Sequence, residues 1–231
     1  MDFSTLTQID LWLIPVLSGP HNIFFDQFTQ VLTYGWTWVV MYLTLLFIVI
    51  KNNETMVQIG IIVMSVMLCL LLSDGMADGI VKPLAHRLRP LNDPEVRPLL
   101  QIVAGVSDRN FSFFSAHAAN TMGICVFFSL LIRNLNMTIA LSAWSLTNCW
   151  TRIYLNMHYP SDILVGLLWG AVSGTLAYLC YLHFYRRVSP RLHFISSQYT
   201  RTGYAFTDVN LVINILLLTV TYAIIRALVM I

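Results

Sequence analysis

Hydrophobic residues along this chain form long runs that short polar segments separate. Six of these runs approach the ~20 residues that a helix needs to cross a bilayer. They cover 33–50, 56–81, 115–133, 137–155, 160–182 and 209–230. The pattern predicts an all-α fold, a polytopic membrane helix bundle with about six transmembrane helices. We expect one membrane-embedded domain over residues 1–231.

Residues 1–32 follow a different pattern. Asp2 and Asp10 and the lack of a basic start argue against a cleavable signal peptide. The segment is instead typical of an amphipathic helix lying in the membrane interface. The apolar residues expected to face inward are Phe3, Leu6, Leu13 and Leu17.

Six spans place both chain ends on one side of the membrane, together with the connections 83–114 and 151–160. The other side holds the connections 51–55, 133–136 and 183–207, and it is the more basic side. Its basic residues are Lys51, Arg133, Arg186, Arg187, Arg191 and Arg201. By the positive-inside rule this side is cytoplasmic, and 183–207 forms a cytoplasmic basic loop before the last span. In a bacterium, the first side would face the periplasm from the inner membrane.

Composition supports membrane embedding, because 57% of the residues are hydrophobic and only 10% are charged, against about 25% charged in soluble domains. A formal charge of +2, spread over several loops, does not predict a nucleic-acid partner. Two sets of small residues, Gly75 with Gly79 and Gly166 with Gly170 and Gly174, predict close helix packing. The cysteines lie in apolar runs without ligand or disulfide spacing, and we interpret them as packing residues. They are Cys69, Cys125, Cys149 and Cys180.

Polar residues gather at the end of the second span, in "SDGMADGIVKPLAHRLRP". Asp74, Asp78 and Lys82 are four residues apart, and Arg89 follows seven residues later, so one helix face carries them. Asp78 is expected either to pair with Lys82 and orient it or only to neutralise the helix end. The alternative is that the basic residues only anchor the helix end by snorkelling, an interpretation that we favour for His86 and Arg87.

Two further polar stretches lie at the same side of the predicted bundle. In "FSFFSAHAANTMG", Ser115 and His117 open the third span, where a helix cap and a structural histidine are the alternatives. In "CWTRIYLNMHYPSD", Arg152 ends the fourth span, and Asp162 lies four residues after His158. Together the three stretches supply arginines, a lysine, histidines, a hydroxyl and helix N-termini. Those groups bind phosphate.

With these spacings the sequence resembles the type 2 phosphatidic acid phosphatase family of membrane lipid phosphatases. The family's first motif is matched by Lys82, six residues, then Arg89 and Pro90. Its Pro-Ser-Gly-His motif is matched in part by residues 114–117, and its Ser-Arg motif with a later His and Asp is matched by Thr151, Arg152, His158 and Asp162. The resemblance covers about residues 74–175. Ala116 and Thr151 depart from the motif glycine and serine.

The resemblance implies a mechanism and a set of site residues. His158 would attack phosphorus to form a phosphohistidine, Asp162 would orient it, and His117 would protonate the leaving lipid oxygen and then activate water. The implied phosphate-binding residues are Lys82, Arg89, Ser115 and Arg152. No metal and no cofactor is implied.

The implied substrate is a membrane lipid phosphate whose chains stay in the bilayer. Candidates are undecaprenyl diphosphate, lipid A phosphate, phosphatidylglycerol phosphate and phosphatidic acid. The outward side favours the first two. The loop 91–110 is expected to roof the site, with Arg97, Asp108 and Arg109 choosing among head groups.

Other functions remain open on sequence alone. Asp74, Asp78 and Lys82 could line the path of an anion or lipid transporter. A scaffold without chemistry would leave the motif spacings unexplained, and membrane embedding disfavours the related soluble haloperoxidases. Nothing in the sequence indicates the oligomeric state.

Overall fold

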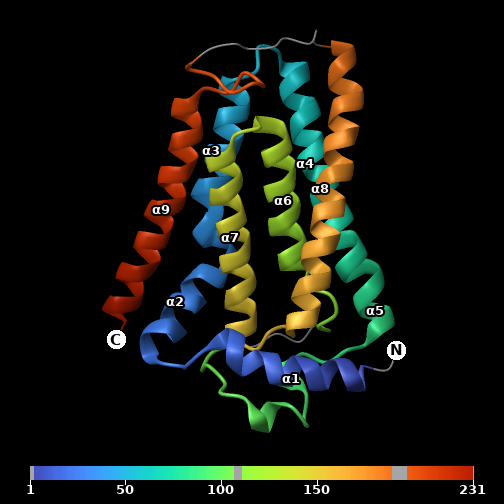
Figure 1. Cartoon of the computed structure of the whole chain (residues 1–231), viewed down its shortest axis with the longest axis vertical. Helices are drawn as coiled ribbons and strands as arrows, with labels where there is room; N and C mark the ends of the chain where they lie inside the picture. The colour runs from blue at the N-terminus through green and yellow to red at the C-terminus, as the bar shows by residue number, and fades with distance from the viewer. Residues whose placement is uncertain (1–2, 107–110, 189–196, 231) are drawn as a thin grey trace.

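The computed structural model describes residues 3–106, 111–188 and 197–230. Its long helices run roughly along one axis (Figure 1). They are α3 (Val39–Lys51), α4 (Met56–Met76), α6 (Ala116–Ile132), α7 (Leu135–Tyr154), α8 (Pro160–Val188) and α9 (Phe206–Val229). Within the described ranges no strand forms beyond an isolated bridge between Tyr199 and Ala205. The predicted all-α membrane helix bundle is confirmed.

Shorter elements gather at one end of the bundle, the lower end in Figure 1. They are α1 (Ser4–Ser18), α2 (Ile23–Thr33), the π-helical η2 (Ala77–Val81), α5 (Lys82–Ala85) and the 3-10 turns η3 (Pro90–Asn92) and η4 (Arg97–Leu99). We call this end the site end. Both chain ends lie there (Figure 1). The 3-10 helix η1 (Gly35–Trp38) connects α2 to α3.

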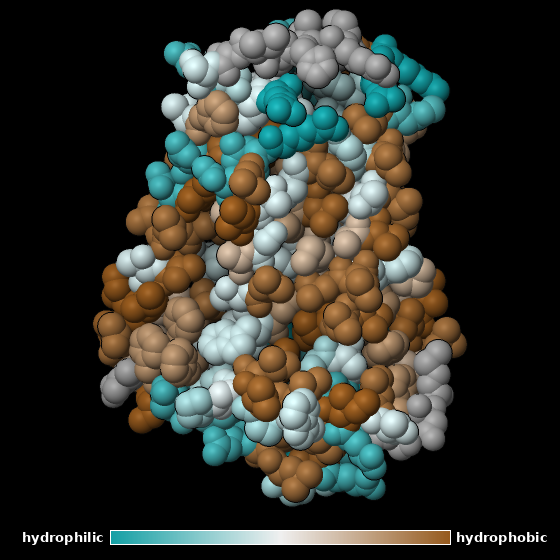
Figure 2. All heavy atoms as spheres, viewed as in Figure 1, coloured by the Kyte–Doolittle hydropathy of each residue, from teal (hydrophilic) through white to brown (hydrophobic). Residues whose placement is uncertain are grey.

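An apolar band crosses the middle of the face shown in Figure 2, between more polar ends. Among the described residues, the segment from Met56, α8 and α9 are each long and apolar enough to cross a membrane. A fourth span results if α2 and the following helix, bent by 68°, count as one. α6 has only 17 residues, and α7 carries polar side chains. Because α6 packs against α4, α7 and α8, it contacts protein rather than lipid over much of its surface.

Capping residues in the sequence account for several helix starts. The Thr55 hydroxyl accepts from the backbone of Gln58 while the Gln58 side chain accepts from the backbone of Thr55, which forms a capping box for α4. The Asn134 side chain caps α7 in the same role. α8 begins at Pro160, a residue suited to the first helical turn.

The predicted span over 33–50 corresponds to the continuous helical stretch Gly35–Lys51, which a 68° bend separates from α2. α2 ends at Thr33, and α3 begins only at Val39, after the 3-10 turn. The bend is held by side chains that satisfy the carbonyls at the end of α2. The Trp38 indole N–H donates to the carbonyl of Leu32 at 2.8 Å, and the Thr37 hydroxyl donates to that of Val31 at 2.6 Å.

The N-terminal segment forms a helix across the site end, as Figure 1 shows for α1. Its inward face differs from the prediction, because Leu17 is 42% exposed while Asp10 and Ile14 are 1% and 3% exposed. Helical spacing places Ser18, also buried, on the same face. α1 therefore covers a polar end of the bundle, and its buried face carries polar residues as well as apolar ones.

The two glycine sets differ in their surroundings. Gly75 and Gly79 face open space, so the predicted packing role is wrong for this pair. On α8, a Cβ on Gly166 would lie 2.6 Å from the carbonyl oxygen of Ser115, and one on Gly174 would lie 2.5 Å from that of Gly123. α6 and α8 are therefore in direct backbone contact, which only glycine permits.

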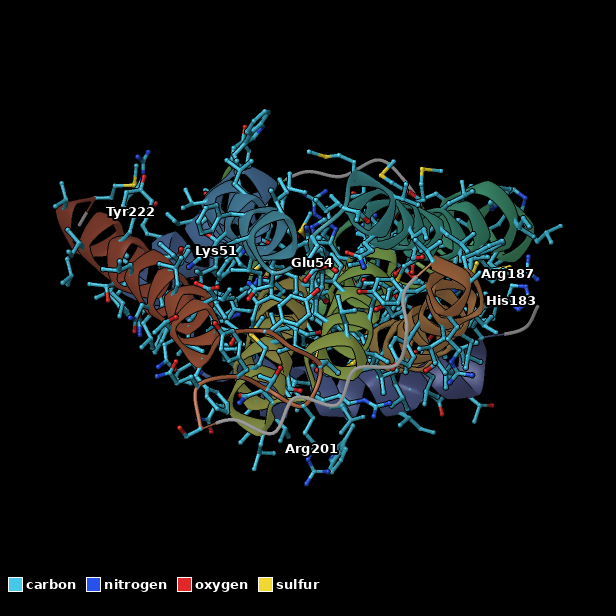
Figure 3. All side chains as sticks on the ribbon, turned by 90° about the horizontal axis from the view of Figure 1, so that it is seen from above. Lys51, Glu54, His183, Arg187, Arg201 and Tyr222 are labelled. Atoms are coloured by element: carbon cyan, nitrogen blue, oxygen red, sulfur yellow. The ribbon has the colours of Figure 1, made fainter. Side chains whose placement is uncertain are left out.

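Basic residues lie at the end opposite the site end. Figure 3, seen from that end, shows Lys51, Arg187 and Arg201 together with Glu54 and His183. Lys51 pairs with Asp208 at 2.6 Å, which ties α3 to α9. Arg191 lies outside the described residues. The two ends therefore differ in charge in the way the sequence pattern indicates.

We expect Gly170→Ala to destabilise the bundle, because the new Cβ would overlap the backbone of Ala119. Overpacking of this kind costs about 1–3 kcal/mol. Thermal unfolding in detergent should show a lower Tm than wild type. Gly60→Ala is the matched control, since nothing lies within 4 Å of its Cβ position, and it should keep or raise the Tm. An unchanged Tm for Gly170→Ala would show that α6 and α8 are not in close contact.

Candidate active site

The three polar stretches meet at the site end. α6 and α8 begin there, α7 ends there, and α5 lies beside them (Figure 1). Because two helices start side by side, their positive dipole ends and free backbone N–H groups face the same region. Such a region favours an anion.

His158 lies in the short connection between α7 and α8. The backbone amides of Met157 and His158 both donate to the carbonyl of Arg152, at 3.0 and 3.4 Å, so the chain turns tightly here. The His158 side chain is only 4% exposed. Its Nε2 is 3.2 Å from a guanidinium nitrogen of Arg89, and its Nδ1 is 3.7 Å from Oδ2 of Asp162. The second distance is longer than a hydrogen bond.

The surroundings of His158 keep its ring neutral. Burial lowers the pKa of His158 to about 4, the neighbouring Asp162 carboxylate opposes that shift, and the Arg89 and Lys82 charges add to it. At neutral pH the ring therefore has a free electron pair on one nitrogen. A neutral imidazole in contact with a cation and a carboxylate has the form that nucleophilic catalysis requires.

Asp162 is fully buried in the first turn of α8. Arg87 donates to its Oδ1 at 2.7 Å, the backbone N–H of Tyr159 donates to its Oδ2 at 3.0 Å, and the Ser112 hydroxyl donates to the same oxygen. The expectation that Arg87 only anchors a helix end is wrong, because its side chain is 4% exposed.

His117 is the second residue of α6. Its Nε2 contacts a guanidinium nitrogen of Arg152. The other terminal nitrogen of Arg152 is 3.0 Å from the sulfur of Met157, whose carbonyl oxygen accepts from Arg89 at 3.0 Å. Both arginines thus approach Met157, and each faces Nε2 of one histidine. The structure brings His117 and His158 together with two cations.

Lys82 and Arg89 are buried, at 6% and 3% exposure. Neither side chain snorkels to water, so the interfacial-anchor alternative is wrong for both. Lys82 pairs with Asp78 at 2.5 Å, as expected from their spacing. Asp74 instead accepts from the Asn120 amide at 2.8 Å. The three residues proposed to line a transport path are therefore engaged in separate local contacts.

Ser115 caps α6, since its hydroxyl oxygen accepts from the backbone of Ala118 at 3.3 Å. A hydroxyl that accepts as a cap keeps its proton for donation. The Ser115 backbone N–H also donates to the carbonyl of Asp162 at 3.1 Å, which joins the starts of α6 and α8. The capping alternative and a phosphate-binding role are compatible at this residue.

Ala116 and Thr151, which depart from the family motif, both lie buried in helices. Ala116 takes the first position of α6 and is 8% exposed. The Thr151 hydroxyl donates to the carbonyl of Asn148 at 2.7 Å and lies 3.2 Å from the Thr33 hydroxyl. Thr151 is fully buried and joins α7 to α2. Its hydroxyl therefore serves helix packing.

The predicted specificity loop is described only in part. Arg97 lies exposed in η4, on the segment below α1 in Figure 1. Asp108 and Arg109 lie outside the described residues. Their role in choosing a head group stays a prediction.

An apolar cavity of about 370 Å³ lies between α3, α4 and α6. Asn120 lines it, one helical turn after His117. The rest of its lining is mostly aliphatic, with Leu46, Val63 and Ile124 as examples. Such a cavity suits an alkyl chain.

Sequence reasoning missed three buried polar residues at the site end. Asp10, Arg87 and Ser112 are each at most 5% exposed. Asp10 and Asp162 are 77 and 75 residues away from Arg87. The one signal in the sequence was Asp10, an acidic residue next to the apolar run at 11–17.

Comparison with known proteins identifies relatives of this arrangement. The family model described as the PAP2 superfamily matches residues 59–186. A lipid A 4'-phosphatase of Bacteroides thetaiotaomicron is 37% identical over 175 residues, which cover 75% of this chain and 77% of that protein. A lipid A 4'-phosphatase of Porphyromonas gingivalis is 28% identical over 183 residues, covering 77% and 75%. No solved structure matches significantly.

The matched region contains all three motifs and the helices that carry them, from α4 to α8. Membership sets aside the transporter and scaffold alternatives, and the expected hydrolase class, a phosphatase, is confirmed. The chain belongs to the PAP2 superfamily.

Proposed function

We propose that this phosphatase removes a phosphate group from lipid A through a phosphohistidine at His158. Both relatives described above carry the name lipid A 4'-phosphatase, and the first shares 37% of its aligned residues with this chain. The apolar cavity beside Asn120 would accept an acyl chain while the phosphate enters the cationic region. Undecaprenyl diphosphate is the competing substrate.

The observation that carries the proposal is the placement of His158. Its two ring nitrogens face opposite charges, Arg89 at Nε2 and Asp162 at Nδ1. A proton held on Nδ1 toward the carboxylate leaves the electron pair on Nε2. That pair faces the cations that would hold the phosphate, so Nε2 is the nucleophile.

The first half-reaction transfers the phosphoryl group. Nε2 of His158 forms a bond to phosphorus, and the bond between phosphorus and the lipid oxygen breaks. When the bound phosphate offsets the positive charge of Arg152 beside it, His117 is protonated, and it donates that proton to the lipid oxygen, so the lipid departs as an alcohol. The phosphorylated ring bears a positive charge while Nδ1 keeps its proton, and the Asp162 carboxylate stabilises it.

Buried cations stabilise the transition state. Lys82, Arg89 and Arg152 would bind the nonbridging oxygens, and the Ser115 hydroxyl would donate to one of them. Preorganised donors in a water-poor site are worth more than the same donors in water. Phosphoryl transfer depends mainly on such positioning and charge stabilisation.

The second half-reaction restores the enzyme. His117, now neutral, accepts a proton from a water molecule as that water attacks phosphorus. The bond between phosphorus and Nε2 breaks, and inorganic phosphate leaves. His117 thereby regains the proton that it gave to the lipid oxygen, so the cycle is balanced.

We further propose that the site end faces the periplasm and that the protein resides in a bacterial inner membrane. The basic residues Lys51, Arg133 and Arg201 at the opposite end support this orientation by the positive-inside rule. An outward site would reach lipids of the cell envelope.

The first test is phosphate release by purified protein from lipid A, undecaprenyl diphosphate and phosphatidic acid, in chelator. Lipid A should be the preferred substrate. His158→Ala should lower release by about 10³-fold or more, because it removes the nucleophile. His183→Ala is the matched control, since His183 lies near the opposite end (Figure 3), and it should keep wild-type turnover. Near-normal turnover in folded His158→Ala would contradict the mechanism, and preference for another lipid would replace the substrate.

His117→Asn separates the two roles of His117. Release of a lipid alcohol needs a proton, so turnover of the lipid should fall by about 10²–10⁴-fold. A nitrophenyl phosphate has a leaving group that needs no proton. The variant should therefore release one nitrophenolate per protein rapidly and then stall, because hydrolysis of the phosphohistidine still needs a base. A burst slowed as much as lipid turnover would exclude His117 as the general acid.

A further inference from the structure

A buried charge cluster lies behind the nucleophile, away from the cations that would hold phosphate. It consists of Asp10 on α1, Arg87 after α5 and Asp162 on α8. The three side chains are 1%, 4% and 0% exposed. The family motifs include only the last of them.

Arg87 is the centre of this cluster. One terminal nitrogen donates to Oδ1 of Asp162 at 2.7 Å and to the Ser161 hydroxyl at 2.8 Å. The other donates to Oδ2 of Asp10 at 2.7 Å and to the Thr7 hydroxyl at 3.2 Å. Arg87 therefore joins α1 to the first turn of α8.

Further contacts fix the position of each partner. The Arg87 guanidinium carbon lies 3.8 Å from the centre of the Tyr159 ring, and the Tyr159 backbone N–H binds Asp162. Asp10 accepts from the backbone N–H of Ser161 at 2.9 Å and from its hydroxyl at 2.6 Å. The cluster is thus anchored on the residues between His158 and Asp162.

Stability alone is a weak reason for such a cluster. Burying a charge costs several kcal/mol, and replacing a buried ion pair with apolar residues is often neutral or stabilising. An apolar residue in place of Asp10 would also suit the inward face of an interfacial helix. The charges need a reason beyond the docking of α1.

Charge balance at Asp162 supplies that reason. The His158 ring becomes positive when it is phosphorylated, so it gains from a negative Asp162. Arg87 holds that carboxylate in place, but its own charge lies beside Asp162 and opposes the positive ring. Asp10 offsets the Arg87 charge, which leaves the cluster with one net negative charge.

We propose that Asp10 and Arg87 are positioning residues for catalysis: Arg87 fixes Asp162 behind His158, and Asp10 balances the Arg87 charge so that Asp162 can stabilise the phosphohistidine. α1 is then part of the catalytic apparatus. This inference rests on the proposed role of His158 as nucleophile.

The test uses the full chain and four variants, three that change the charges of the cluster and one control. Asp10→Asn and Arg87→Gln each unbalance the cluster, whereas the double variant removes one charge of each sign. Trp150→Phe is the docking control, because it removes the hydrogen bond from the Trp150 indole to the carbonyl of Leu17 on α1 and leaves the charges of the cluster unchanged. Each protein is checked by thermal unfolding and assayed for kcat and KM with lipid phosphate.

We expect Asp10→Asn to lower kcat about ten-fold, the effect of ~1.4 kcal/mol on a barrier, with KM within about two-fold. Arg87→Gln should lower kcat further, since Asp10 and Asp162 then repel. The double variant should turn over faster than Arg87→Gln and at least as fast as Asp10→Asn. Trp150→Phe should keep wild-type kcat.

A double variant as slow as, or slower than, the worse single variant would overturn the proposal, because mere docking of α1 predicts that result. Wild-type kcat in folded Asp10→Asn would overturn it too. Wild-type protein and His158→Ala are assayed in parallel. Activity that survives in His158→Ala refutes the proposed mechanism, whereas its loss there together with wild-type rates in Asp10→Asn and Arg87→Gln refutes this inference alone.

Discussion

Direct backbone contact between α6 and α8 is the constraint on which the rest of the site depends. Gly166 and Gly174 leave no room for a Cβ between the two helices. The same contact brings two helix N-termini together and joins them by the hydrogen bond from Ser115 to the carbonyl of Asp162. His117 is the second residue of α6, and His158 lies two residues before the start of α8. Close packing of α6 against α8 therefore sets the distance between the two candidate catalytic histidines at the site end.

Charge is distributed at the site end in two layers. Lys82, Arg89 and Arg152 lie on the side where phosphate would bind, whereas Asp10, Arg87 and Asp162 lie behind His158, the proposed nucleophile. His158 stands between the layers and stays neutral because it is buried. A charged group in such surroundings is stable only with partners. Asp78 pairs with Lys82 in the first layer and Asp10 pairs with Arg87 in the second, and a bound phosphate would add further negative charge to the first layer.

The two N-terminal helices contact residues of the candidate active site. α1 places Asp10 against Arg87, and α2 places the carbonyl of Thr33 3.4 Å from Arg152. Both helices precede the region that the family model matches. Elements outside the motif region thus support residues inside it, which is how unrelated sequence can tune a shared reaction.

The sequence by itself determined the helix bundle, the order of its long helices and the motif residues, because hydropathy and helical spacing are local properties that successive residues carry. It did not determine the bend after Thr33, the open surroundings of Gly75, or the buried face of α1. Those depend on contacts between residues far apart in the chain. Arg87 looks like any helix-end cation until tertiary structure brings Asp10 and Asp162 to it from 77 and 75 residues away. Burial and pairing exist only in three dimensions, and they alone distinguish a surface anchor from a buried residue that holds Asp162 beside His158.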